Sequence, residues 1–230
     1  MIGRARGVAA ARLRDPAMDL ALRDGLSFCI TSGEPVFLDL PADRYFCLGA
    51  DTRDAFLGLI DGQTDPRAVD TLVELGLLVR RAGYPIAPAN VQSPIRSLVE
   101  DAGPLRLRHL PRAAYRTTRT AAGLRLRGLP RAVGRIRRRK ARIAARAGTA
   151  SAAEIARAHE SLALITASLD KCLWRSLAIA HHLLDRRLSP DLVLGVHLRP
   201  FKAHCWVQLG DTLVNDRIET VRAFAPILVV

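Results

Sequence analysis

The sequence predicts an α+β fold, because segments typical of strands and segments typical of helices occur in separate blocks along its 230 residues. Residues 26–48 have the composition of short strands, and residues 51–76 carry apolar side chains at helical spacing. Further along, residues 152–188 are helical in pattern and residues 192–230 are strand-like. We expect this last block to pack a helix on an antiparallel sheet.

Three strands are predicted in the first block, because short runs rich in β-branched and aromatic residues alternate there with turn-forming residues. The runs are residues 27–31, 36–40 and 44–48. Two helices follow, and Pro66 suits the first turn of the second one. Prolines at 85, 88 and 94 then interrupt the pattern. We therefore predict one domain over residues 1–88, a basic connecting region over 89–150 that belongs to the second domain, and the core of that domain over 151–230.

The positive charge of the chain is concentrated in its middle. The chain has 35 Lys and Arg against 22 Asp and Glu, a formal net charge of +13. Fifteen of the basic residues lie between Arg106 and Arg146, and no acidic residue occurs between Asp101 and Glu154. We expect helices here that complete the second domain and shape its entrance.

A basic run of this kind is typical of proteins that bind nucleic acid backbones. Tyr115 is the only aromatic residue within it, and no base-reading helix is evident. A DNA-binding regulator therefore stays an alternative, whereas a surface for an acidic peptide or a partner enzyme is the plainer interpretation.

The cysteines and the start of the chain favour a cytoplasmic protein. The four cysteines form no CxxC pair, and the chain is too large and too poor in cysteine for a disulfide scaffold. Four arginines interrupt the first 20 residues, which leaves no apolar core for a signal peptide. No uncharged apolar run approaches the ~18 residues that a membrane span needs. We expect no membrane association.

Cys172 is the candidate nucleophile. It falls in the first turn of the helix predicted over 171–188, where free N–H groups and the helix dipole favour a thiolate. A lone cysteine among apolar residues is more often an inert core residue. The assignment therefore depends on what the following strands place beside it.

His204 and Asp216 are the candidate partners of Cys172. A three-residue hairpin loop, Leu209–Asp211, would set His204 opposite Asp216 with both side chains on one face. A two-residue loop would put Asp216 on the other face, so we predict the three-residue loop. His204 would then activate the thiol and protonate the leaving amine, while Asp216 would fix the imidazole tautomer. The Cys172 backbone N–H and the Gln208 side chain are the candidate oxyanion donors.

A metal site is an alternative interpretation, because several possible ligands lie close together in the sequence: His181, His182, His197, His204 and Cys205. Neighbouring strand residues point to opposite faces, and neighbouring helix residues diverge by about 100°. No HxxxH or CxxC spacing occurs among them. We predict that the site holds no metal.

Five motifs in the last third of the chain resemble the transglutaminase-like cysteine peptidase domain of lasso peptide biosynthesis B proteins. They are Asp170–Ala178, Leu194–Val196, Pro200–Val207, Val214–Asp216 and Phe224–Leu228. The resemblance covers about residues 150–230 and implies that Cys172, His204 and Asp216 are the catalytic triad of a leader peptidase. The chain departs from the family at Cys205, where alanine is common, and at Gln208, where an acidic residue is common.

The first 88 residues resemble the winged-helix domain that recognises precursors in ribosomal peptide maturation, as in stand-alone pyrroloquinoline quinone chaperones. In that family the leader peptide adds as a strand to the sheet edge beside a helix. The resemblance implies that the strand at 44–48 and the helix at 66–75 form this groove. Its predicted leader-binding residues are Arg44, Tyr45, Phe46 and Leu72, some of which are expected to be core residues instead.

Together these features predict a cytoplasmic cysteine peptidase that binds the leader of a lasso peptide precursor and removes it. The resemblance implies a partner, an ATP-dependent macrolactam synthetase that receives the freed core peptide. This chain has no GxxxxGK[ST] loop, so we expect it to bind no cofactor itself. Acyl transfer to an amine, as in true transglutaminases, is a second alternative because it shares the same thioester.

Overall fold

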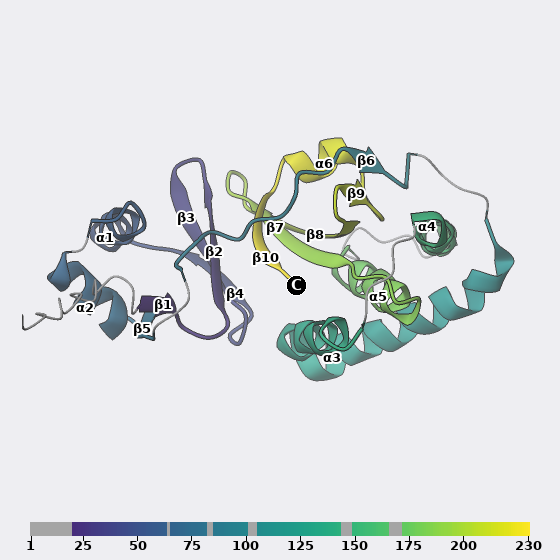
Figure 1. Ribbon diagram of the computed structural model, residues 1–230, viewed down its shortest axis with the longest axis horizontal. Helices are drawn as coiled ribbons and strands as arrows, with labels where there is room; N and C mark the ends of the chain where they lie inside the picture. The colour runs from purple at the N-terminus through teal and green to yellow at the C-terminus, as the bar shows by residue number, and fades with distance from the viewer. Residues whose placement is uncertain (1–19, 64, 82–84, 101–104, 144–148, 166–171) are drawn as a thin grey trace, which may run out of the picture. The chain divides into compact units, whose positions relative to one another are not determined.

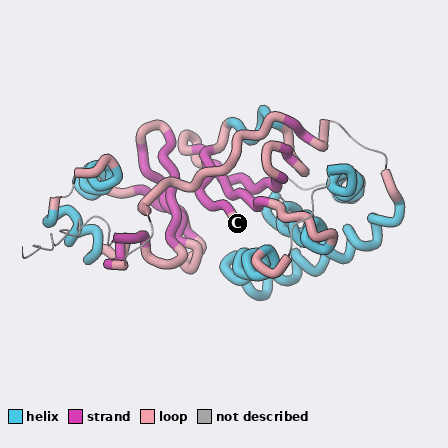
Figure 2. The backbone as a smooth tube through the Cα atoms, viewed as in Figure 1, coloured by secondary structure: helices cyan, strands magenta, loops and turns pink. Residues whose placement is uncertain are grey.

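The computed structural model describes residues 20–63, 65–81, 85–100, 105–143, 149–165 and 172–230 (Figure 1). Its contacts divide the chain into two compact units. Unit 1 combines the chain up to Asp24 with Gly49–Ala87, and unit 2 combines Gly25–Leu48 with Pro88–Val230. Helices and separate sheets occur together (Figure 2), so the predicted α+β class is confirmed.

Unit 1 is a small helical unit with one short sheet. Strands β1 (Leu20–Leu22) and β5 (Leu78–Arg80) pair antiparallel, and helices α1 (Ala50–Ile60) and α2 (Pro66–Glu74) lie between them in sequence.

The start of α2 follows from its local sequence. Asp65 accepts a hydrogen bond from the Arg67 backbone N–H, and Pro66 occupies the first helical position, where its missing N–H costs nothing. The helix buries Val69 and Leu72, while α1 buries Phe56.

Unit 2 is built around a five-stranded sheet with the strand order β10-β7-β8-β9-β6. The strands are β6 (Arg96–Ser97), β7 (Asp191–His197), β8 (Lys202–Leu209), β9 (Thr212–Leu213) and β10 (Ala225–Val229). All neighbours are antiparallel except β6 and β9, which are parallel. Strand β6 thus forms one edge of this sheet, whose other four strands all come from the end of the chain.

Several helices pack around this sheet, and α5 contacts β8 and β7 (Figure 1). They are the 3₁₀ turn η2 (Leu107–His109), α3 (Leu110–Lys140), α4 (Thr149–Ile165), α5 (Cys172–Asp185) and α6 (Ile218–Arg222). Helix α3 is interrupted at Gly128, whose φ of 70° is left-handed, with Pro130 just beyond it. Both α3 and α4 pack against α5.

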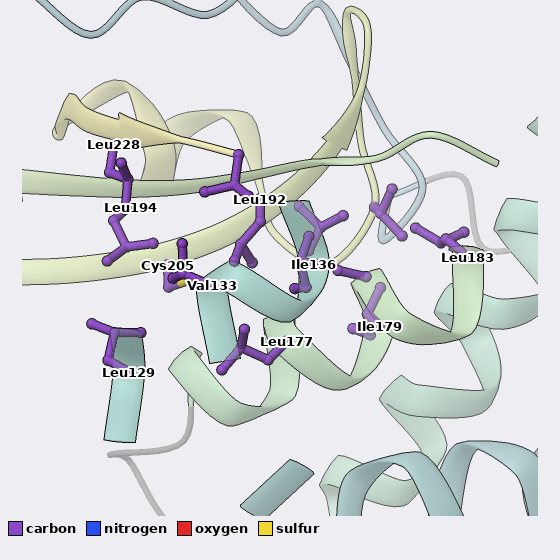
Figure 3. Packing of buried hydrophobic residues seen from close by; sticks show 14 of the residues in the cluster. Leu129, Val133, Ile136, Leu177, Ile179, Leu183, Leu192, Leu194, Cys205 and Leu228 are labelled. Carbon is purple, nitrogen blue, oxygen red and sulfur yellow. The ribbon is translucent and has the colours of Figure 1, made fainter. Parts of the chain in front are cut away.

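The core of unit 2 lies between α5 and the sheet. Leu177 and Leu183 of α5 belong to one buried cluster with Leu194 of β7, Cys205 of β8 and Ile136 of α3 (Figure 3). All five are buried. At roughly 1.5–3 kcal/mol for each large apolar side chain, this burial fixes α5, and hence its first residue, against β8.

A second, three-stranded sheet belongs to unit 2. It has the order β2-β3-β4, with β2 (Leu26–Thr31), β3 (Glu34–Asp39) and β4 (Arg44–Cys47). One face carries a stacked row of Phe28, Phe37 and Phe46. On the other face, Val36 and Leu38 are buried in the same cluster as the core of unit 2, and β2 and β3 contact β10.

The contacts therefore divide the chain differently from the boundary predicted near residue 88. The three strands and the two helices of the predicted N-terminal domain fall into different units, because the strands bury their apolar face on β10. Among the described helices, none combines the length and apolar character required to cross a bilayer.

Candidate active site

Cys172 is the first residue of α5, and its thiol is partly buried. Burial by itself raises the pKa of this thiol. The side chain of His204 and the backbone N–H groups of Cys205 and Leu173 act in the opposite direction, since each stabilises the thiolate. Their combined effect is larger, so the pKa of Cys172 is lowered from its usual value of 9.0.

The other three cysteines differ from Cys172 in this respect. Burial raises the pKa of Cys29 to about 12, and it also raises the pKa values of Cys47 and Cys205. All four cysteines are free thiols. Cys172 is thus the thiol in this chain whose surroundings favour nucleophilic chemistry at neutral pH.

His204 connects the thiol to a carboxylate. Its Nε2 lies 2.5 Å from Asp216 Oδ2, and both side chains are largely shielded from solvent, with exposed fractions of 19% and 15%. Because Nε2 faces the carboxylate, Nδ1 is the nitrogen left to face Cys172. Burial lowers the pKa of His204, but the hydrogen bonds to Asp216 and Cys172 and their negative charges raise it to about 9.

Asp216 reaches His204 by a different route from the one predicted. Gln208 pairs with Leu213 and Leu209 pairs with Thr212, so the hairpin has the two-residue loop Gly210–Asp211. The prediction of a three-residue loop is wrong. Continued strand pairing in this register would turn Asp216 to the other face, but β9 ends at Leu213 and the chain bends over residues 214–216. The bend brings the carboxylate back to the imidazole.

Two buried polar side chains that sequence reasoning missed hold this bend. Asn215 accepts a hydrogen bond from the Val207 backbone N–H at 2.8 Å and donates one to Ser176 Oγ at 2.9 Å. Ser176 in turn donates to the Cys205 carbonyl oxygen at 2.7 Å. Ser176 lies one helical turn after Cys172, so the network joins α5, β8 and the bend. The Asn215-Asp216 dipeptide after a strand was the available sequence signal.

Ser97 of β6 holds Asp216 from the outer side. Its hydroxyl donates to the Asp216 carbonyl oxygen at 2.6 Å and accepts a hydrogen bond from the Val99 N–H at 3.2 Å. Ser97 is buried, with an exposed fraction of 2%. Nothing in the sequence relates this serine to a residue 119 positions further on, so it could not have been predicted.

Aromatic rings enclose the imidazole. The His204 ring lies 5.1 Å from the Phe224 ring and 6.2 Å from the Trp206 ring, between centroids. Gly195 is the residue paired with His204 across β7 and β8. A Cβ at Gly195 would stand 2.6 Å from the Trp206 indole, so glycine is required for the indole to lie across the strand.

Gln208 is not placed to act as an oxyanion donor, contrary to the prediction. Its side-chain amide donates both hydrogens, to the carbonyl oxygens of Gln92 and Gly210 at 2.8 Å each. Its oxygen accepts from the Trp206 indole N–H at 3.0 Å. Gln208 is fully buried four residues along β8 from His204, where it stabilises the hairpin turn.

The predicted leader-binding residues fall in two different places. Arg44, Tyr45 and Phe46 belong to β4 in unit 2, where Arg44 is exposed and lies over the Phe46 ring at 5.4 Å. Leu72 belongs to unit 1 and is fully buried in its interior. Leu72 is therefore a core residue, because a side chain without exposed surface has none to offer a peptide.

Tyr45 brings β4 close to the candidate nucleophile. Its ring packs against Phe201 at 5.4 Å between centroids, and Tyr45 and Cys172 both border the core cluster of unit 2. Burial is the main cause that raises the pKa of Tyr45 to about 12, and the charges of Cys205, Asp43 and Cys172 add to it. Tyr45 of β4 is thus close enough to Cys172 for the thiolate charge to affect the pKa of its phenol.

No group of three or more His, Cys, Asp or Glu side chains that could hold a metal ion occurs among the described residues. His181 and His182 are instead buried in the packing of α5, and His204 and Cys205 lie on opposite faces of β8. Cys172, His204 and Asp216 therefore combine a thiol, a base and a carboxylate that can orient the base. This combination is used in nucleophilic acyl transfer.

Comparison with known proteins identifies the superfamily of the chain. The family model described as the transglutaminase-like superfamily matches residues 114–229, which is half of the chain, so the chain belongs to this superfamily. A segment of 45 residues is 40% identical to the microcin J25-processing protein McjB of Escherichia coli. That match covers 20% of this chain and 22% of McjB. No solved structure matches the chain.

Proposed function

We propose that this protein is a cysteine peptidase that removes the leader from a ribosomally synthesised lasso peptide precursor. The observation that carries the proposal is the meeting of Cys172, His204 and Asp216, with a lowered thiol pKa and a raised imidazole pKa. Membership of the transglutaminase-like superfamily and the similarity to McjB support it.

In this mechanism the Cys172 thiolate attacks the carbonyl carbon of the last leader residue, while His204 carries the proton. The tetrahedral intermediate collapses as His204 Nδ1 protonates the leaving amine, which frees the core peptide and leaves a thioester on Cys172. His204 then takes a proton from water, the hydroxide attacks the thioester, and the leader departs with a free carboxylate. The Asp216 carboxylate stabilises the imidazolium in both stages.

The oxyanion needs donors beside the thiol. The Cys172 backbone N–H is one, since the first residues of a helix have N–H groups without an intrahelical acceptor. The Tyr45 phenol would be a second donor, since the charge of Cys172 acts on it and burial keeps it protonated at neutral pH.

The leader itself would bind along β4. The outer edge of β2 is occupied in part, because the Ala89 N–H donates to the Phe28 carbonyl. Strand β4 pairs only with β3 among the described residues, so its other edge offers backbone groups to an added strand. A leader bound there would pass Tyr45 and approach Cys172. The freed core peptide would then go to an ATP-dependent macrolactam synthetase.

The experiment compares the wild-type protein with Cys172→Ala on a lasso peptide precursor that the wild-type protein binds. We expect Cys172→Ala to lose cleavage and to keep precursor affinity within about twofold, whereas Cys29→Ala keeps both. Mass spectrometry of the released leader separates the two chemistries: a free carboxylate indicates hydrolysis, and a leader amide indicates acyl transfer to an amine. Unchanged cleavage by Cys172→Ala would overturn the proposal.

A further inference from the structure

Helix α3 and His181 of α5 line a basic cavity whose lining includes none of Cys172, His204 and Asp216. The cavity has a volume of about 270 Å³ and lies between the parts of α3 before and after Gly128. Six of the residues that line it are arginines: Arg116, Arg119, Arg127, Arg131, Arg135 and Arg139. Thr120, Gly123, Leu124, Ala132 and His181 complete its lining.

The cavity is a consequence of helical periodicity on both sides of the break. Before Gly128, Arg116, Arg119 and Arg127 recur at spacings that share one helix face. After it, Arg131, Arg135 and Arg139 recur every fourth residue. The left-handed conformation of Gly128 turns the second stripe toward the first. Two rows of guanidinium groups therefore face one space.

The charges in this space are not balanced within the described part of the chain. Asp185 of α5 accepts from Arg116 and from Arg139, at 2.5 Å and 2.6 Å. None of the residues that line the cavity is acidic. Three arginines of α3 form ion pairs with Asp185: Arg112, Arg116 and Arg139. Four other cavity arginines make no ion pair with a described carboxylate: Arg119, Arg127, Arg131 and Arg135.

Four guanidinium groups around one small space, none of them paired with a carboxylate of the described residues, repel one another, and an anion placed among them would remove that repulsion. Arginine presents planar, forked donors that match phosphate oxygens in pairs. The volume is small beside the roughly 300–1,000 Å³ of ordinary ligand pockets, so a compact anion fits better than a large ligand.

We propose that this cavity, which we term the α3 arginine cavity, binds a compact polyphosphate group, either free pyrophosphate or the diphosphate portion of a nucleotide. The convergence of the two arginine rows on one concave space distinguishes it from an extended surface for duplex DNA, where basic groups follow a phosphate backbone. This site does not depend on the proposed peptidase activity.

The test is calorimetric titration of the full chain with pyrophosphate, ATP and orthophosphate at low salt. We expect pyrophosphate to bind at one site per chain, more tightly than orthophosphate by at least about tenfold, because a diphosphate can engage both arginine rows. If ATP binds as tightly as pyrophosphate, the cavity recognises the diphosphate group itself, whether it is free or part of a nucleotide, and the proposal is supported. Binding of ATP without binding of pyrophosphate would overturn the proposal.

A matched pair of variants separates the cavity from general charge. Arg127→Gln/Arg131→Gln removes two cavity arginines, and Arg137→Gln/Arg138→Gln removes two exposed arginines of the same helix outside it. We expect the first variant to lose at least about tenfold in pyrophosphate affinity and the second to lose less than about threefold. Equal losses in both, or random duplex DNA that displaces pyrophosphate equally from both, would indicate diffuse electrostatic attraction and overturn the proposal. Thermal unfolding without ligand checks that both variants are folded.

Discussion

The side-chain amide of Asn215 donates a 2.9 Å hydrogen bond to the Ser176 hydroxyl, which joins the bend next to Asp216 to the helix that begins at Cys172. Both residues are buried, and each makes a second hydrogen bond to the backbone of β8. Cys172, His204 and Asp216 stand on three separate segments: α5, β8 and the bend after β9. This pair of residues fixes the spacing of all three.

A double-mutant cycle of Asn215→Ala and Ser176→Ala tests the coupling. Asn215→Ala leaves the Val207 N–H without its acceptor and removes the donor to Ser176 Oγ, which keeps its own hydrogen bond to the Cys205 carbonyl, so we expect a loss of about 1–3 kcal/mol in the free energy of unfolding. The loss in the double variant should be smaller than the sum of the single losses by about 0.5–3 kcal/mol, measured by chemical denaturation. Additive losses would mean that the two residues act independently.

Asp216→Asn should change the pH dependence of cleavage. The pKa of His204 is raised to about 9 in part by the Asp216 hydrogen bond and charge, so loss of the charge lowers it. We expect kcat/KM to fall by about 10²–10⁴ and its alkaline limb to move from near pH 9 to lower pH. Asp211→Asn removes the same charge from the nearby hairpin turn and should leave the alkaline limb in place. An unmoved limb in Asp216→Asn would contradict the assigned role.

The residues of the His-Asp pair could be predicted from the sequence, but the path of the chain between them could not. Strand alternation correctly separates His204 from Cys205, since alternation is a local property of extended backbone. The hairpin register was wrong because it assumed that strand pairing continues to Asp216. The bend that replaces it depends on Asn215 reaching Ser176, a contact between residues 39 positions apart. Gln208 was misassigned for a similar reason, since its partner Gln92 lies 116 positions away.

The sequence also could not predict that the first 88 residues are divided between the two units. Local pattern places strands over 26–48, and strands form there as β2, β3 and β4. The local pattern of a strand does not show which other part of the chain will cover its apolar face. Val36 and Leu38 pack in the cluster that contains Leu228 of β10, nearly 200 residues later, and only the folded chain brings these residues together.

Gly195→Ala should impair the site without touching a reacting group. A methyl group there would stand 2.6 Å from the Trp206 indole, which is buried and rigid, so the ring must shift. Because Trp206 stacks beside His204, we expect kcat to fall while KM for the precursor changes little. The control is Gly134→Ala in α3, where a new Cβ would meet only the flexible end of Arg138. Equal activity in Gly195→Ala and the wild type would show that the indole does not position the imidazole.

Leader binding along β4 should be visible in hydrogen exchange of the backbone. A strand added to this edge would engage the N–H groups of β4 that do not pair with β3, so leader peptide should slow exchange over residues 44–48. Strands β1 and β5 of unit 1 serve as an internal control, because they pair with each other rather than with β4. Protection confined to unit 1, with none in β4, would assign the leader to a different surface.

Buried histidines should make the fold sensitive to acid. His159 Nε2 lies 3.2 Å from His182 Nδ1, and His109 Nε2 lies 2.9 Å from Glu154 Oε2 at the other end of the cluster. Burial lowers the pKa of His159 to about 3 and that of His182 to about 4, with smaller contributions from neighbouring positive charges.

The sign of the effect follows from proton uptake. Unfolded histidines bind protons near pH 6.5, whereas these two stay neutral in the folded chain until about pH 4 or below. The unfolded state therefore binds more protons between pH 6.5 and 4, and the free energy of unfolding falls as pH falls through this window. We expect His159→Leu to reduce the slope by about 1.4 kcal/mol per pH unit, measured by denaturation at several pH values. An equal slope in His159→Leu and the wild type would mean that His159 is protonated in the folded chain.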